Sequence, residues 1–206
     1  MCRTPERVDP ALAEKTRGFR YGPVGPIFSI HLALNERPVY TAEAREPDAG
    51  RILLTLVGMD SREDMFEFHR AHEEGRIPRK LFFNGTTPTV FDSSQAPPGK
   101  HTAFMWQMVP YSLADGGPRR WREIQDELLD ALHDRWAEYA PNLRKPGVIV
   151  NRFCQTPLDI EAHIATMVRG DQLEGHLADG QFYDRRPIPE LSGYRTPVGG
   201  LYLCGG

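Results

Sequence analysis

Apolar and polar residues alternate strictly along two stretches of the chain, residues 27–34 and 101–109. Successive side chains of a strand point to opposite faces, so a period of two predicts strands with two different faces. The less apolar face of the first stretch carries Ile27, Ser29, His31 and Ala33. One face of the second stretch carries Thr102, Phe104, Trp106 and Met108.

Other apolar runs predict further strands. Residues 52–57 are apolar apart from Thr55, and a run of this kind is typical of a central strand that is covered on both faces. Residues 201–204 follow a Gly-Gly turn and predict a buried strand. Shorter strands are expected at residues 81–83, 89–91 and 148–153.

Two capping boxes, at residues 61–64 and 156–159, predict helix starts. At this spacing a side-chain oxygen accepts one free backbone N–H and a carboxylate accepts another in return. The first helix is expected to end at Gly75 and the second near Val168. A short helix is expected at residues 11–16.

The longest predicted helix follows Pro118 and ends before Pro141. Large apolar residues recur there at steps of three and four, which is the spacing of one helix face. They are Trp121, Ile124, Leu128, Leu132 and Trp136.

Helices and strands are interspersed without a regular strand–helix–strand alternation. This order predicts an α+β fold with a mixed, largely antiparallel sheet and helices packed on one side. Residues 1–22 are expected to form a solvated lead-in segment, and residues 171–197 to be irregular. A long irregular segment in a compact domain is often functional.

Composition and charge exclude several classes of partner. The formal net charge is −3 without a basic stripe, which argues against nucleic-acid binding. No apolar run approaches the roughly 20 residues that a membrane span needs, and the amino terminus lacks the apolar core of a signal peptide. Three widely spaced cysteines, Cys2, Cys154 and Cys204, predict free thiols in a reducing, cytoplasmic compartment.

Sequence motifs of the common catalytic and nucleotide sites are missing. The chain has no G-x-S-x-G, P-loop or H-E-x-x-H motif, and no G-x-G-x-x-G after a strand. His69 and His72 are spaced as a metal pair beside Glu73, but no third ligand accompanies them, so we expect no metal site. The Gly205-Gly206 pair would let backbone amides approach a phosphate, although an ordinary β-turn has the same sequence.

A set of short motifs resembles one enzyme family. In order along the chain they are Pro98-Gly99-Lys100-His101, Gln107-Met108-Val109-Pro110-Tyr111, Tyr139-Ala140-Pro141-Asn142, Thr156-Pro157-Leu158-Asp159, Arg186-Pro187, Tyr194-Arg195-Thr196-Pro197 and Gly200-Leu201-Tyr202-Leu203-Cys204-Gly205. Spaced over residues 23–206, they resemble the carboxyl half of phytoene-desaturase-like FAD oxidoreductases. The resemblance is closest to the branch of pyridine nucleotide-disulphide oxidoreductase domain-containing proteins.

The resemblance implies an amine-oxidase-like flavoprotein in which an FAD domain and a substrate domain form one enzyme. Residues 23–193 would form the substrate-binding domain, and residues 194–206 would begin the strand that returns to the FAD domain. Gly205 and Gly206 would then lie at the cofactor. Because the dinucleotide fingerprint and the glycine-rich turn that normally follows this strand are missing, we expect the chain alone to bind no FAD and to be inactive.

The same resemblance implies hydride transfer from an apolar substrate to the flavin. Candidate substrate contacts are Phe104, Trp106, Met108 and Tyr111, with Gln107, Gln181 and Arg186 as polar contacts near the flavin. For any single aromatic residue of this set, ordinary core packing is favoured over a substrate contact. The motifs identify no catalytic residue.

A different function is also compatible with the sequence. The chain would then be a standalone module derived from this domain, which binds a hydrophobic ligand or a protein partner through its sheet face. In either case, surface that an FAD domain would cover is exposed, which predicts a homodimer that buries residues 201–204.

Overall fold

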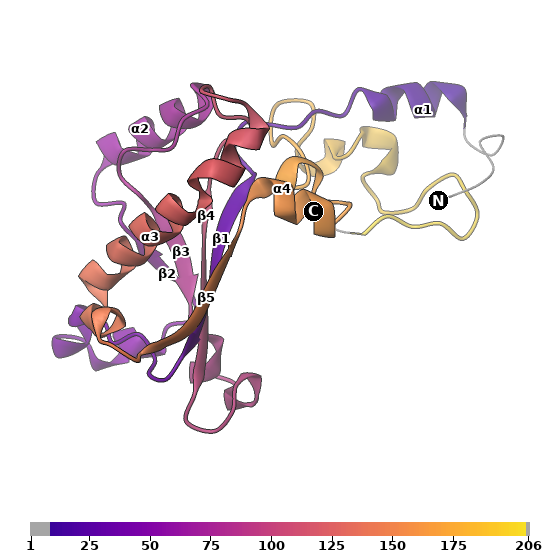
Figure 1. Ribbon diagram of the computed structural model, residues 1–206. Coiled ribbons are helices and arrows are strands. Elements are labelled where there is room, and N and C mark those ends of the chain that lie inside the picture. Colours follow the sequence, from indigo (N-terminus) through magenta and orange to yellow (C-terminus); the bar gives the residue numbers. More distant parts are fainter. Residues whose placement is uncertain (1–8, 205–206) are drawn as a thin grey trace.

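The computed structural model of the protein describes residues 9–204. Its centre is a five-stranded antiparallel sheet with the strand order β2-β3-β4-β1-β5 (Figure 1). The strands are β1 (Ile27–Leu34), β2 (Thr55–Val57), β3 (Phe83–Thr86), β4 (His101–Met108) and β5 (Ile149–Gln155). The α-helices are α1 (Pro10–Arg17), α2 (Arg62–Glu73), α3 (Trp121–Tyr139) and α4 (Pro157–His163). The predicted α+β class is confirmed, and every strand pairing of the sheet is antiparallel.

The two alternating stretches form the middle of this sheet. β1 pairs along its whole length with β4, from Ile27 opposite Met108 to Leu34 opposite His101. Its other side pairs with β5, where Ser29 lies opposite Gln155. The pairing is antiparallel and keeps its register except for a shift between Ala33 and Leu34 in the β1–β5 pair, so the two faces predicted for β1 and β4 become the two faces of one sheet.

Helix α3 covers one face of the sheet and forms the core with it (Figure 1). Alternate residues of β1 and β4 point to this helix, and Trp121 and Trp136 of α3 are completely buried. The Trp136 ring packs against Phe83 of β3 with the ring centroids 5.6 Å apart. The apolar stripe predicted for the longest helix is therefore the stripe that holds the sheet.

Both predicted capping boxes are present. The Ser61 side chain accepts the N–H of Asp64, whose carboxylate accepts the Ser61 N–H in return, and Thr156 and Asp159 do the same for α4. Helix α4 is shorter than predicted, since it ends at His163. The apolar pattern continues beyond it because Ile164 and Met167 line a hollow beside the sheet.

The prediction of a central strand at residues 52–57 was wrong. β2 is three residues long, lies at the sheet edge and pairs with β3 alone. Val57 is buried, but Ile52, Leu53, Leu54 and Leu56 are 46–65% exposed. An apolar run does not reveal by itself whether both of its faces are covered, and none of the described elements covers the second face of this run.

The two other short strands before residue 100 were also placed imprecisely. β3 begins at Phe83 instead of Leu81, and residues 88–90 form a 3-10 turn instead of a strand. Pro88 starts this turn. A proline fixes its own backbone angle and supplies no N–H for a ladder, so the turn replaces a strand there.

The predicted buried strand at residues 201–204 was wrong as well. Its residues fold back in a small hairpin, in which Leu203 donates its N–H to the Tyr194 carbonyl at 2.7 Å and one bridge joins Arg195 to Tyr202. Leu201, Tyr202 and Leu203 are 36–58% exposed. Gly205 and Gly206 lie outside the described residues, and the homodimer through this segment stays a prediction.

Residues 171–197 form an irregular segment, as predicted, built from short 3-10 turns. The segment lies beside α1 in Figure 1 and holds the residues that follow this helix. Arg20 donates its N–H to the Gln181 side chain at 2.8 Å, and its carbonyl accepts the N–H of His176 at 2.8 Å. The two ends of the described chain therefore stabilise each other.

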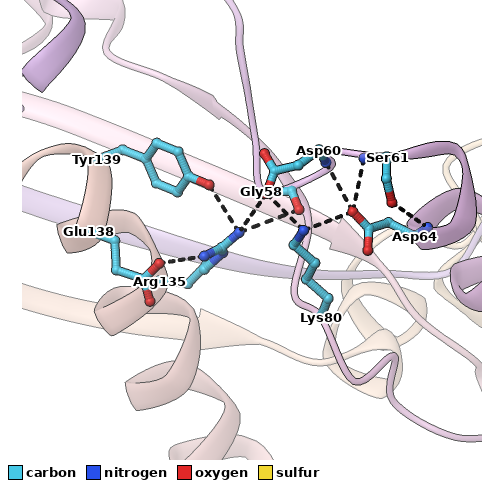
Figure 2. Close-up of polar contacts among 8 residues, drawn as sticks. All are labelled: Gly58, Asp60, Ser61, Asp64, Lys80, Arg135, Glu138 and Tyr139. Atoms are coloured by element: carbon cyan, nitrogen blue, oxygen red, sulfur yellow. Dashed lines mark hydrogen bonds and ion pairs between the residues drawn. The ribbon is translucent and has the colours of Figure 1, made fainter.

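A network of charged side chains joins the loop before α2 to helix α3 (Figure 2). Lys80 donates to Asp64 at 2.8 Å and also contacts Asp60 at 2.7 Å. The hydrogen bond from Lys80 lowers the pKa of Asp64 to about 2. Arg135 of α3 donates to the Gly58 carbonyl at 3.4 Å and to the Tyr139 hydroxyl at 3.0 Å. The network therefore fixes the loop that follows edge strand β2 to helix α3.

Among the described residues, no helix has the length and apolar character needed to cross a membrane.

Candidate substrate-binding face

Within residues 9–204, no helical layer covers the face of the sheet opposite α3, which carries the second set of side chains of each strand. The strand register arranges these side chains in rows. One row is Trp106, Ser29 and Gln155, and the next is Phe104, His31 and Phe153. We call this surface the open face. It combines aromatic rings with hydrogen-bonding groups, whereas the α3 face of β1 is wholly apolar.

Four rings form a continuous stack across three strands of the open face. The centroid of the His31 ring lies 4.6 Å from that of Phe153 and 5.9 Å from that of Phe104, and the interplanar angles are 7° and 18°. The ring centroids of Phe104 and Trp106 are in turn 5.4 Å apart, with an interplanar angle of 21°. Rings that are stacked in this way present their edges outward, and Phe153 is still 54% exposed. The stack is therefore a preformed apolar surface that a ligand can contact without rearranging it.

His31 brings polar chemistry into the middle of this stack. Its Nε2 lies 3.2 Å from the hydroxyl oxygen of the buried Ser29. Burial lowers the pKa of His31, and hydrogen bonding with the Gln155 side chain opposes this effect without reversing it. The imidazole is therefore neutral near pH 7, where it can both donate and accept a hydrogen bond.

Two hollows lie on the open face, and His31 and Phe104 line both of them. The first, of about 400 Å³, lies between the sheet and the residues at the end of α4, and we call it the α4 hollow. Its apolar lining is Ile27, Phe104, Trp106, Ile160, Ile164 and Met167, and its polar lining is Ser29, His31, Gln155 and Gln172. The second, of about 430 Å³, extends toward Asn151 and Gln95. Both volumes are in the range that holds small ligands.

Three of the seven residues predicted to contact substrate come from β4 and share the open face. Phe104, Trp106 and Met108 alternate along the strand on that side, each of them half-buried. Gln107 points to the opposite face, where it is buried and accepts the Phe82 N–H at 3.3 Å. Gln107 therefore lies on the α3 face of β4, whereas Trp106 and Met108 lie on the open face.

The other predicted contacts lie outside the open face. Tyr111 donates its hydroxyl hydrogen to Glu161 at 2.7 Å; burial, followed by this hydrogen bond, raises the pKa of Tyr111 to about 12. Gln181 is buried and holds the Arg20 backbone. Arg186 donates to the carbonyls of Leu173 and Gly175. The seven residues therefore do not form one site, and their role in substrate binding stays a prediction.

Four residues of the open face were not selected from the sequence: Ser29, His31, Phe153 and Gln155. The alternation of residues 27–34 already placed Ser29 and His31 on one face of a strand. It did not show that this face meets the aromatic face of β4. That information lies in the strand order and register, which no local pattern contains.

No group of three or more potential metal ligands occurs among residues 9–204. His72 is buried in α2, where its Nδ1 lies 2.7 Å from the Phe68 carbonyl. His69 is exposed and lies 3.4 Å from Glu73. His72 is therefore packed inside the protein, whereas His69 lies on the exposed side of α2.

The described residues do not fit FAD as a bound cofactor. All five strands pair antiparallel, so the sheet contains no strand–helix–strand unit of the kind that places a pyrophosphate at a helix N-terminus. The two candidate cofactor residues, Gly205 and Gly206, lie outside the described range.

Comparison with known proteins gives relatives that are named as dehydrogenases or oxidoreductases. No protein-family model matches the sequence. The chain is 31% identical over 183 residues to a subunit of limonene dehydrogenase from Castellaniella defragrans, and the match covers 87% of this chain and 32% of the relative. It is 35% identical over 148 residues to pyridine nucleotide-disulfide oxidoreductase domain-containing protein 2 of Mus musculus, covering 69% of this chain and 25% of the relative.

A third relative is phytoene dehydrogenase of Streptomyces griseus, 30% identical over 135 residues, covering 62% of this chain and 23% of the relative. The chain thus spans about a third or less of the length of each of these relatives. The matched names confirm the resemblance that the short motifs indicated.

Proposed function

Because the chain belongs to the phytoene-desaturase-like FAD-dependent oxidoreductases, we propose that it forms the substrate-binding portion of such an enzyme. The open face would hold an apolar substrate while a C–H hydride passes to a flavin bound by a separate FAD domain. The proposed partner of this chain is that FAD domain, and we expect the chain alone to be inactive. The Castellaniella relative is named as a subunit, which supports the need for a partner.

The observation that carries the proposal is the ring stack on an uncovered sheet face. His31, Phe104, Trp106 and Phe153 sit above a fully formed core, so they are not needed to complete it. Aromatic groups that remain accessible beside hollows of ligand size are typical of binding surfaces. Limonene and phytoene, which appear in the names of two relatives, are hydrocarbons, and an apolar substrate is complementary to such a surface.

The residues of this chain can contribute binding, orientation and exclusion of water. The stack and the apolar lining of the α4 hollow would remove water from one side of a substrate. The neutral His31 adds no net charge near the substrate, which keeps the surface compatible with a hydrocarbon. When bound in its own domain, a flavin supplies the hydride acceptor.

Calorimetric titration of the purified chain with FAD and, separately, with limonene tests the proposal. Limonene is expected to bind saturably, whereas FAD at concentrations up to about 100 times the protein concentration is expected to give no saturable heat. Stoichiometric FAD binding would show that the chain holds its own cofactor site. If neither compound binds, the alternative of a protein-interaction module is favoured instead.

A further inference from the structure

The α4 hollow has more hydrogen-bonding capacity than a hydrocarbon can use. Ser29, His31 and Gln155 come from two neighbouring strands and point into the same hollow. Ser29 and Gln155 are direct partners in the register, and His31 lies two residues from Ser29 on the same face. The three polar groups thus converge on one place in an otherwise apolar lining.

Counting hydrogen atoms shows which kind of ligand group fits. A serine hydroxyl, a neutral imidazole and a carboxamide together carry four polar hydrogens. The contacts of His31 with Ser29 and with Gln155 use one hydrogen each, whichever imidazole tautomer is present. At least two donors therefore remain for other partners, and Gln172 at the edge of the hollow adds two more. A ligand that supplied no acceptor would leave such donors unsatisfied when it displaced water.

The charge of the lining restricts the ligand further. None of the ten residues that line the α4 hollow is aspartate, glutamate, lysine or arginine. A charged ligand would lose its hydration there without gaining an opposite charge, which is costly in an apolar setting. The complementary ligand is a neutral molecule with an apolar body and one oxygen acceptor.

We propose that the α4 hollow binds a neutral, oxygen-bearing apolar molecule, with its carbonyl or hydroxyl oxygen held by donors of Ser29 and Gln155 that His31 orients through its own hydrogen bonds. The ring stack and the residues at the end of α4 contact the hydrocarbon part. This inference rests on the proposed function and specifies the ligand class of the same face. His31 acts in it as a positioning residue, because it orients the Ser29 and Gln155 side chains.

A pair of ligands with one carbon skeleton tests the inference. Limonene and carvone share a ring and two double bonds, and carvone adds a ketone oxygen. Calorimetric titration of the purified chain should show carvone binding about 5 to 30 times more tightly than limonene, which corresponds to one or two hydrogen bonds. Equal affinities would overturn the inference and leave the proposed function standing. If neither limonene nor carvone bound, the inference would be overturned and the result would also count against the proposed function.

Variants of His31 and Ser29 test whether the preference for carvone over limonene arises in the α4 hollow. His31→Phe retains a ring between Phe104 and Phe153 but removes its nitrogen atoms, and Ser29→Ala removes the hydroxyl. Each should bring the carvone-to-limonene affinity ratio down to within about twofold while limonene affinity changes little. His69→Phe, the same change at an exposed histidine of α2 that lines neither hollow, is the matched control and should keep the wild-type ratio. A ratio that survives in both His31→Phe and Ser29→Ala would overturn the inference.

Discussion

Replacing Phe104 and Trp106 together by alanine is expected to weaken limonene binding by about 30- to 160-fold. Each substitution removes a ring from the stack, and an apolar contact of this size contributes about 1 to 1.5 kcal/mol, or about tenfold in affinity. Both side chains are half-buried on the open face, so the core beneath them should remain intact. Calorimetric titration measures the effect, and circular dichroism verifies the fold.

The control for this prediction is a double variant that removes two aromatic rings elsewhere. Phe66 and Tyr202 are 61% and 58% exposed, and neither lines a hollow of the open face. Phe66→Ala with Tyr202→Ala should leave limonene affinity within about twofold of wild type. If both double variants lost affinity equally, the ring stack could not be the binding surface.

Replacing Trp136 by alanine is expected to lower the free energy of unfolding by about 3–5 kcal/mol. The side chain is completely buried between α3 and the sheet, where it packs on Phe83 and donates its indole N–H to the Tyr40 hydroxyl at 3.2 Å. Its removal leaves a cavity and takes a hydrogen-bond partner from Tyr40. Urea unfolding followed by circular dichroism measures the change.

Leu56→Ala is the control for the core prediction. Leu56 belongs to the apolar run that the sequence favoured as a central strand, yet it is 65% exposed in edge strand β2. Its replacement should change the free energy of unfolding by less than about 0.5 kcal/mol. A large loss for Leu56→Ala together with a small loss for Trp136→Ala would contradict the assignment of the core.

The elements that could be predicted from the sequence are those with a complete local signal. β1 and β4 alternate over eight residues each, and α3 carries an apolar stripe bounded by prolines. The capping boxes fixed the starts of α2 and α4 because their hydrogen bonds involve residues only three apart. Signals of this kind need no knowledge of the rest of the fold.

The features that could not be predicted depend on residues far apart in the sequence. The exposed apolar run before β2 and the hairpin at residues 201–203 look like buried strands until the neighbouring layers are known. The ring stack of the open face also depends on residues far apart in the sequence. Phe104 and Trp106 were candidates from β4 alone, but His31 and Phe153 became part of the stack only through the register of β1 with β4 and β5.

Trp106 offers the most direct test of the claim that the open face binds an apolar ligand. The chain has three tryptophans, of which Trp121 and Trp136 are completely buried and Trp106 is half-buried, so Trp106 should account for the quenching of fluorescence by acrylamide. Saturating limonene is predicted to reduce the wild-type quenching constant at least about twofold, with no such change in Trp106→Phe. A quenching constant that stays the same while calorimetry shows bound limonene would place the ligand elsewhere and contradict the account.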